Sequence, residues 1–245
     1  MAMPVRFRNY EELSERQREQ RFDRFHRRSL KAKDLQPLLR GRFRPILRKC
    51  GFIQASESLS HRAVEPHYVH FLRLCFSAVF PGRFFVRAGI ALDFLPLSDW
   101  TAFDPKRVSL DVDCLFTKEV TLPNGNPEFD NGINLAEANE TIDYLIVAFK
   151  RFDRDYFQKF KRFPAPVEAL GVDFVRRLTK LVEQNSESEF GVNGATVEFF
   201  TLRLALIQKF LGHMSKARKL LEYGLACYEL FDLKKRYSKL LRDLV

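Results

Sequence analysis

The chain has 245 residues, 46% hydrophobic and 29% charged, which is ordinary for a globular protein large enough to bury a core. Its longest apolar run falls short of the roughly 18–20 residues that a membrane span needs, and its charged N-terminus lacks the apolar stretch of a signal peptide. We therefore expect a cytoplasmic protein without membrane contact. The four cysteines are far apart and form no C-x-x-C pair, which predicts reduced thiols and no zinc site.

Positive charge is concentrated at the N-terminal end. Residues 1–49 carry 15 Lys and Arg against 6 Asp and Glu, which accounts for +9 of the net charge of +10. Residues 1–33 predict a basic helical arm that begins at a capping box of Asn9 and Glu12. The arm can be a solvated helix stabilised by Glu–Arg pairs at helical spacing. Alternatively, its arginines can bind the phosphates of a nucleic acid; they are Arg16, Arg21, Arg24, Arg27 and Arg28.

Residues 34–122 predict an α+β domain that begins with a helix. Leu35–Cys50 has apolar residues at helical spacing and is followed by Gly51. Pro37 is tolerable in the first turn of this helix, whereas Pro45 should distort its middle. Phe52–Val64 is polar and predicts an edge strand.

A hairpin is expected at the centre of a mostly antiparallel sheet. Tyr68–Phe80 and Phe84–Leu95 are rich in β-branched and aromatic residues and are separated by Pro81-Gly82. Both alternating sets of side chains in Tyr68–Phe80 are largely apolar, so this strand should be covered on both faces. The helix at residues 35–50 is the expected cover for one face, and the C-terminal helices are expected on the other.

The end of the sheet domain is predicted from a further alternating segment. Arg107–Lys118 alternates apolar and polar residues, which predicts an antiparallel strand with one wet face. Residues 122–132 are rich in proline and asparagine and form the expected connector and domain boundary.

Residues 133–245 predict an all-α helical bundle packed against the sheet. Asn134 and Glu137 form a capping box before its first helix. Further helices are expected up to Glu183, over residues 195–211 and over Leu233–Leu244. The inner face of the first helix should be apolar; it comprises Leu135, Ala138, Ile142, Leu145, Phe149 and Phe152.

One segment of the bundle has a repeat-like pattern. Residues 198–231 resemble a single tetratricopeptide helix pair. Gly212 allows a tight turn between the two helices, and Ala217 and Gly224 allow close helix approach. No second copy is evident, so a helical bundle is expected rather than a solenoid.

Two stretches of the sheet region resemble a known family pattern, with the spacing of the second shortened by one residue. They are LQPLLRGRFRPILRKCGFIQASESLSHR, in which a helix ends at Gly51-Phe52, and HYVHFLRLCFSAVFPGRFFVRAGIAL, which contains Phe85-Val86-Arg87-Ala88-Gly89-Ile90. On these residues the segment 34–118 resembles the domain of unknown function 4304 family. The resemblance implies an α+β domain without established activity. It also implies a cytoplasmic bacterial interaction or immunity-type protein rather than an enzyme.

Candidate catalytic residues are few. Asp111 and Asp113 share a face of the expected strand and can act as acid and base or bind a cation; the alternative is a solvated sheet face. His61, His67 and His70 lie close in sequence, but His67 and His70 should point to opposite faces of a strand. The sequence contains no P-loop, dinucleotide-binding, zinc-protease or hydrolase motif, so we expect no cofactor and no metal.

An aromatic pair lies in the polar loop that follows the hairpin. Trp100 and Phe103 can anchor a protein partner, or they can close the end of the core.

These observations lead to three functional hypotheses. The first is a non-catalytic protein-interaction module, immunity-type or regulatory, in which an open sheet face or a helical groove receives a protein partner. The alternative is a nucleic-acid-binding protein that uses residues 6–49. A second alternative is an enzyme with an acidic and histidine site on the sheet. The sequence predicts neither the partner nor the oligomeric state.

Overall fold

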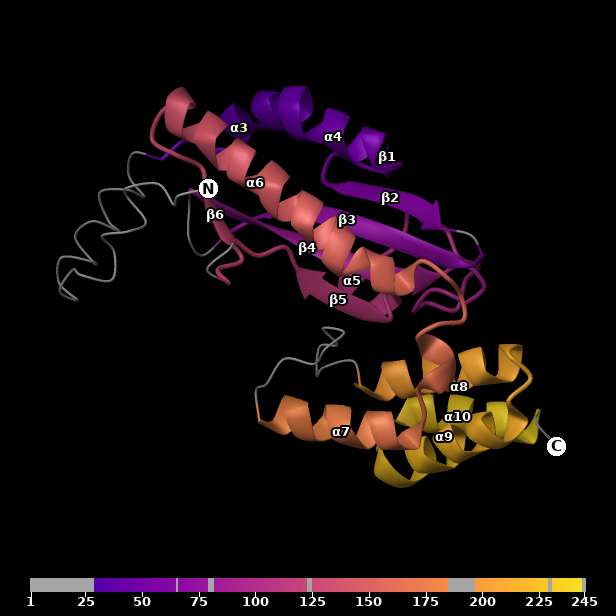
Figure 1. The fold of residues 1–245 in the computed structure, drawn as a ribbon. Coiled ribbons are helices and arrows are strands. Elements are labelled where there is room, and N and C mark those ends of the chain that lie inside the picture. The colour runs from indigo at the N-terminus through magenta and orange to yellow at the C-terminus, as the bar shows by residue number, and fades with distance from the viewer. Residues whose placement is uncertain are drawn as a thin grey trace. The chain divides into compact units, whose positions relative to one another are not determined.

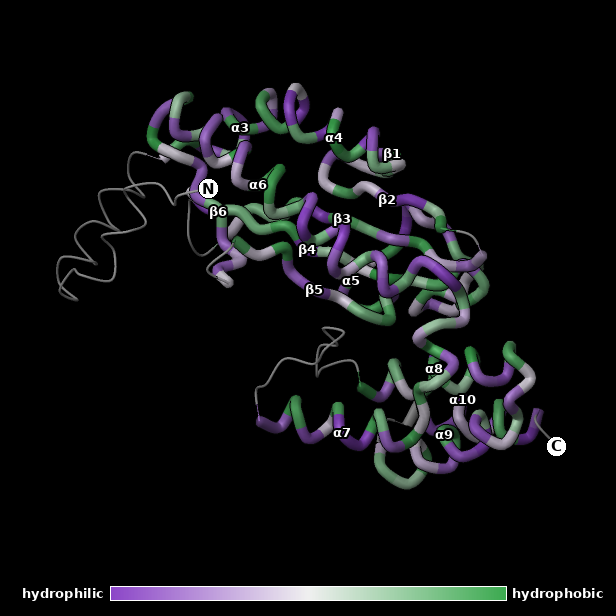
Figure 2. Tube along the Cα trace, viewed as in Figure 1, coloured by the Kyte–Doolittle hydropathy of each residue, from purple (hydrophilic) through white to green (hydrophobic). Residues whose placement is uncertain are grey.

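The computed structural model describes residues 29–64, 66–78, 82–122, 125–184, 197–228 and 231–243. These residues form the expected α+β fold, with a helical segment, an antiparallel sheet and then further helices (Figure 1). Hydrophobic residues run along much of the sheet, as Figure 2 shows. In this described part of the chain, no helix combines the length and the apolar character needed to cross a membrane.

The chain forms two compact units, and neither is continuous in sequence. The first unit comprises Met1–Lys49, Cys75–Phe85 and Thr121–Ala148. The second unit comprises Cys50–Leu74, Val86–Val120 and Phe149–Val245.

The first unit contains a distorted helical segment. α3 (Ala32–Leu38) continues into a π-helical turn (Leu39–Phe43) and then into α4 (Arg44–Lys49). Pro45 has no backbone N–H to donate, and the wide turn directly before it is the distortion that we expected. The helix begins three residues before Leu35, so the expectation that Pro37 lies in the first turn was wrong; Pro37 lies inside α3.

The wide turn also keeps the apolar side chains of this segment aligned. Four residues exceed an α-helical turn of about 3.6 residues, so side chains spaced by four would otherwise drift around the helix. The side chains at this spacing are buried; they are Leu35, Leu39, Phe43 and Leu47. Arg42 ties the segment to the helix α6 (Leu135–Asp155) by donating to the Asn139 side chain at 2.8 Å and pairing with Asp143.

A short strand lies where we expected only a connector. β6 (Glu128–Asp130) pairs antiparallel with the start of β4 (Arg83–Leu92), with Phe84 opposite Phe129. The rings of this pair stack with centroids 5.4 Å apart. Arg83 pairs with Glu128 and, at 3.5 Å, with Asp130. Side-chain pairing across the ladder thus makes a strand of a segment that is poor in strand-forming residues.

Helix α6 begins at the predicted cap. The Asn134 side chain accepts from the Glu137 N–H at 3.0 Å, and the Glu137 carboxylate accepts from the Ile133 N–H at 3.3 Å. Leu135 does not lie on the inner face, because 60% of it is exposed at the start of the helix. The other predicted inner-face residues are buried; they are Ala138, Ile142, Leu145, Phe149 and Phe152.

The sheet consists, in spatial order, of β1 (Ile53–Gln54), β2 (Leu59–Val64), β3 (Tyr68–Phe76), β4 and β5 (Phe116–Glu119), and β6 also pairs with β4. The single edge strand expected over Phe52–Val64 is divided into β1, which lies at the edge, and β2, which pairs with both β1 and β3; β3 and β4 are the expected hairpin strands. The pairs β1–β2, β2–β3, β4–β5 and β4–β6 are antiparallel.

The first half of β3 is buried on both faces, as predicted. Tyr68 contacts Phe160, and His70 stacks on Phe157, so the turn at residues 157–160 covers one face. On the other face Val69 and Phe71 belong to a buried cluster with loop residues that include Leu97, Val108 and Leu110. The turn at residues 157–160, from the C-terminal part of the chain, therefore covers one face, and residues between β4 and β5 cover the other.

The expected strand at Arg107–Lys118 was largely wrong. Leu110–Asp113 forms the short helix α5, and only Phe116–Glu119 pairs with β4. Asp113 holds this turn, because its two carboxylate oxygens accept from the N–H groups of Ser98 at 2.6 Å and Ser109 at 2.7 Å. A buried carboxylate with two backbone donors stabilises a turn at the place where the alternating pattern predicted extended chain.

The end of the second unit is helical. Figure 1 shows the four C-terminal helices side by side, and their contacts agree. Two 3₁₀ turns (Phe157–Phe160 and Val167–Ala169) precede them. The helices are α7 (Val172–Glu183), α8 (Val197–Phe210), α9 (Met214–Cys227) and α10 (Phe231–Arg242).

Helix α8 is the centre of this group because it is buried around most of its circumference. Even its Arg203 is buried, where it donates to the Asp113 carbonyl and pairs with the Asp113 carboxylate at 3.4 Å. Gly212 has a φ of +75° in the turn to α9, which agrees with the tight turn expected there.

Candidate functional site

A basic groove lies between the start of α7 and the outer side of α9. Helix α7 is amphipathic: Val175 and Leu178 are buried, whereas Arg176 and Arg177 are exposed. Hydrophobic and hydrophilic residues accordingly alternate along α7 in Figure 2. This alternation leaves one flank of α7 to face α9.

Helix α9 supplies the opposite wall. Its inner positions, Ala217, Leu220, Leu221 and Gly224, are buried against neighbouring helices. Lys216, Lys219 and Tyr223 recur every three or four residues, so they share a neighbouring face of the helix. This face lines the groove.

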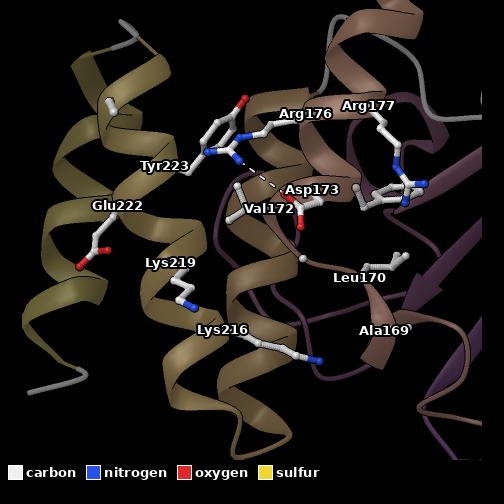
Figure 3. A pocket seen from close by; sticks show the side chains of 13 residues that line it. Ala169, Leu170, Val172, Asp173, Arg176, Arg177, Lys216, Lys219, Glu222 and Tyr223 are labelled. Carbon is white, nitrogen blue, oxygen red and sulfur yellow. Dashed lines mark hydrogen bonds and ion pairs between the residues drawn. The ribbon is translucent and has the colours of Figure 1, made fainter.

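The groove encloses about 890 Å³ and is lined by both walls (Figure 3). This volume is in the range of ligand-binding clefts. Leu170, at its base, is buried, and Val172, Phe174 and Tyr223 are half-buried. The lining residues are Ala169, Leu170, Gly171, Val172, Asp173, Phe174, Arg176, Arg177, Lys216, Lys219, Glu222, Tyr223 and Ala226.

Arg176 is positioned by contacts from both walls. Its guanidinium carbon lies 5.5 Å from the centre of the Tyr223 ring, and its Nη1 lies 3.4 Å from the Asp173 carboxylate. Burial raises the pKa of Tyr223, and the neighbouring Cys227 raises it further, so the hydroxyl is protonated and can donate at neutral pH. The Arg176 guanidinium and the Tyr223 hydroxyl therefore place several hydrogen-bond donors at one end of the groove.

Lysines occupy the other end. Lys216 Nζ donates to the Glu168 carbonyl at 3.0 Å. Lys219 has no hydrogen bond or ion pair with any residue that the structure describes. Both side chains extend from α9 towards the start of α7, whereas Glu222 points away from it (Figure 3). The lining carries four cations and two carboxylates, so the groove favours an anionic occupant.

The predicted aromatic pair is divided between two environments. The Trp100 ring is covered by Arg236 of α10, whose guanidinium carbon lies 4.1 Å from the ring centre. Phe103 packs against the buried cluster of the sheet and meets Phe71 with ring centroids 6.4 Å apart. The structure therefore does not bring Trp100 and Phe103 together at one contact surface.

Asp111 and Asp113 do not share the face of a strand, because both lie on α5. Asp111 is 53% exposed and pairs with Arg87. Asp113 is buried, holds two backbone N–H groups and pairs with Arg203. Asp113 thus has a structural role, and the predicted pairing of the two aspartates on a strand was wrong.

The three histidines lie in separate surroundings. His61 lies opposite Phe71 and His70 opposite Arg62 on β2 and β3, so these two histidines point to opposite faces of the sheet. His67 precedes β3 with a φ of +72°, and its Nδ1 lies 2.9 Å from the Asp93 carboxylate. The expectation that His67 lies on the strand with His70 was therefore wrong.

His70 is held in a neutral form by its surroundings. Its Nε2 lies 3.0 Å from the Phe160 carbonyl, which can only accept, so Nε2 carries the proton. Its Nδ1 accepts from Arg62 Nε at 3.2 Å. Burial, together with the Arg62 charge, lowers the pKa of His70 to about 3. A histidine fixed in this way supports the fold rather than transferring protons near neutral pH.

The remaining predicted site lies in the basic arm. Residues 1–28 are outside the described part of the chain. Five predicted phosphate-binding residues therefore fall there: Arg16, Arg21, Arg24, Arg27 and Arg28. Among the described residues, no three His, Cys, Asp or Glu side chains gather where they could hold a metal ion.

Sequence reasoning did not single out the groove residues. Arg176-Arg177 and the spacing of Lys216, Lys219 and Tyr223 were visible signals, but each is ordinary for an exposed helix face. Only the packing of α7 beside α9 joins the two faces into one lining.

Comparisons with known proteins add no relative. The chain matches no protein-family model, no curated protein and no solved structure. The resemblance of residues 34–118 to the domain of unknown function 4304 family, and that of 198–231 to a tetratricopeptide pair, remain predictions.

Proposed function

We propose that this protein is a non-catalytic interaction module whose α7–α9 groove binds an acidic segment of a protein partner. The observation that supports this proposal is the combination of a half-buried apolar lining with an excess of cations in one cleft. An extended or helical peptide can bury apolar side chains against Leu170, Val172 and Phe174. Its carboxylates can pair with the lysines of α9 and with Arg176.

The charge balance decides which kind of segment fits. Lys219 is exposed and unpaired among the described residues, and Lys216 is held only by a backbone carbonyl. A carboxylate of the partner can pair with either lysine without first breaking an internal ion pair. Rim charges of this kind contribute mainly to the association rate and to partner selection.

The first test selects peptide ligands for the full chain. Peptides from a random display library are selected on the immobilised protein, and the winners are measured by fluorescence polarisation. We expect enrichment of Asp and Glu next to apolar residues. The double variant Lys216→Glu/Lys219→Glu should weaken binding at least tenfold.

Arg218→Glu is the matched control. Arg218 is an exposed residue on the same helix but does not line the groove. This variant should keep the affinity within about twofold, because the charge that it reverses lies outside the groove, whereas the double variant reverses two charges inside it. Enrichment of neutral or basic peptides, or an equal loss of affinity in Arg218→Glu, would show that the groove is not the binding site.

A second test separates protein from nucleic acid as the partner. The full chain is used to capture partners from its native cell with and without nuclease. We expect a protein that remains bound after nuclease treatment and is lost with the double lysine variant. A partner that disappears with nuclease would support the nucleic-acid alternative instead.

A further inference from the structure

The α7–α9 groove holds its cations at two ends. Lys216 and Lys219 lie three residues apart on one side of α9 and extend towards the start of α7 (Figure 3). The other end is marked by Tyr223, where the Arg176 guanidinium carbon lies 5.5 Å from the ring centre. In Figure 3 the half-buried Val172 side chain lies between them. The groove therefore has a lysine end, an apolar middle and an arginine end.

The separation of the two ends follows from the geometry of α9. Lys219 and Lys216 lie four and seven residues before Tyr223, which corresponds to about 6 and 10 Å along the axis of an α-helix. The contact with the Tyr223 ring holds Arg176 at the level of that ring. Carboxylates bound at the two ends would therefore lie up to about 10 Å apart.

Each end keeps hydrogen-bond donors for a ligand. Arg176 uses Nη1 in its 3.4 Å contact with Asp173, whose side chain is 92% exposed. A guanidinium carries five N–H donors in a planar fork, so Arg176 has further donors for a second carboxylate. Lys219 has no hydrogen bond or ion pair with any residue in the described part of the chain. A ligand can thus bind at both ends without breaking an internal ion pair.

The two ends also belong to opposite walls. The lysines project from α9, whereas Arg176 projects from α7. Successive side chains of an extended segment point to opposite sides, and three residues of such a segment span about 10 Å. Acidic residues three positions apart therefore reach one wall each, at the separation of the two ends. Acidic residues two or four positions apart would face the same wall.

We propose that the acidic segment of the partner is extended and carries two acidic residues three positions apart, with an apolar residue between them. One carboxylate binds Lys216 and Lys219, the apolar side chain packs on Val172, and the other carboxylate binds Arg176. This motif rests on the proposed function of the groove and defines its partner more narrowly. Two carboxylates at another spacing engage only one end well.

Four synthetic peptides of identical composition test the motif on the full chain. Each carries two glutamates two, three, four or six positions apart, one leucine between them, and serine and glycine elsewhere. Fluorescence polarisation at low ionic strength should show about three- to fivefold tighter binding at a spacing of three, which is the effect of one exposed ion pair. All four peptides carry the same charge, so general attraction to a basic chain cannot produce this difference. Equal affinities, tightest binding at another spacing, or no binding by any peptide would overturn the motif.

Arg176→Gln tests the arginine end. In this variant the four peptides should bind with equal affinity, because only the lysine end remains. Lys180→Gln is the matched control, since Lys180 is exposed on α7 but does not line the groove, and it should keep the preference. A preference that survives in Arg176→Gln would contradict the motif.

The Lys216→Glu/Lys219→Glu variant distinguishes failure of the motif from failure of the groove. If the four peptides bind equally to the wild type but lose affinity in this variant, the motif is wrong and the groove proposal stands. If the peptides bind and their affinity does not depend on these lysines, both proposals are wrong. If no peptide binds, the motif is wrong and the display selection decides on the groove.

Discussion

The orientation and protonation state of individual side chains in this protein depend on their surroundings. His70 illustrates this, because its ring stacks on Phe157 with centroids 4.5 Å apart and both of its nitrogens are used. The Arg62 guanidinium that donates to it also pairs with Asp153 and packs over Phe52. Adding a proton to His70 would place a second buried charge beside Arg62 and remove the acceptor for its N–H.

Stability should consequently decrease as the pH is lowered from 6.5 towards 3. The pKa of His70 is about 3 in the folded chain and about 6.5 in the unfolded chain, so the unfolded chain takes up the proton first. The contribution is complete above pH 6.5 and falls by about 1.4 kcal/mol per unit below it, or roughly 2–3 kcal/mol by pH 4.5. Urea unfolding of the wild type and of His70→Gln at several pH values measures this.

The variant should be less stable at pH 7 but should have a shallower slope between pH 6.5 and 4.5. Equal slopes for the two proteins would show that His70 does not titrate in this way. Sequence reasoning placed His70 on a strand but could not identify its partners. Arg62 is eight residues away on a neighbouring strand, and Phe160 is ninety residues away.

At the scale of elements, close packing of the C-terminal helices depends on one missing side chain. A Cβ placed on Gly224 of α9 would lie under 3.0 Å from three ring carbons of Tyr237 in α10. Tyr237 is buried, and its hydroxyl donates to the Glu198 carbonyl of α8 at 2.7 Å. The ring is therefore held from two sides and cannot move away.

Gly224→Ala should destabilise the protein by about 1–3 kcal/mol, because added volume in a packed interior forces strain. Gly41→Ala is the matched control, since it is also a helical glycine but has nothing within 4 Å of its added Cβ. That control should stabilise the protein by about 0.5–1 kcal/mol through helix propensity. Urea unfolding of both variants should give changes of opposite sign, and a loss of equal size in both would argue against the tight α9–α10 contact.

Local sequence pattern predicted some helices and strands correctly and others incorrectly. α6 was predicted well because its cap and its apolar spacing are both local features. Arg107–Lys118 was mistaken for a strand because the alternation there has another cause. Val108 and Leu110 are buried in the loop cluster, and Asp113 is buried by its contacts with Ser98 and Arg203.

At the scale of the whole molecule, charge is the property on which the proposed binding of an acidic segment depends most. The chain carries +10 overall, and four of its cations line the groove. These groups are exposed or half-exposed, so dissolved salt screens them over a distance of about 10 Å at 0.1 M. An acidic ligand should therefore sense them strongly only at low ionic strength.

Affinity for a selected acidic peptide should fall at least severalfold between 0.05 and 0.5 M salt. The apolar part of the contact does not weaken with salt, so some binding should remain. Fluorescence polarisation across this range measures the slope, which should be shallower for the Lys216→Glu/Lys219→Glu variant than for Arg218→Glu. An affinity that does not change with salt would rule out an electrostatic role for the groove.

The amino-acid sequence by itself determined the α+β class, the central hairpin, the α6 cap and the glycines of the C-terminal turn and helix contact. Those features depend on neighbouring residues, whose spacing is visible along the chain. The tertiary structure decided the rest, including the groove and the buried Asp113–Arg203 pair. Their members lie on different elements, and Lys219 and Arg176 share one lining only once α7 and α9 have packed.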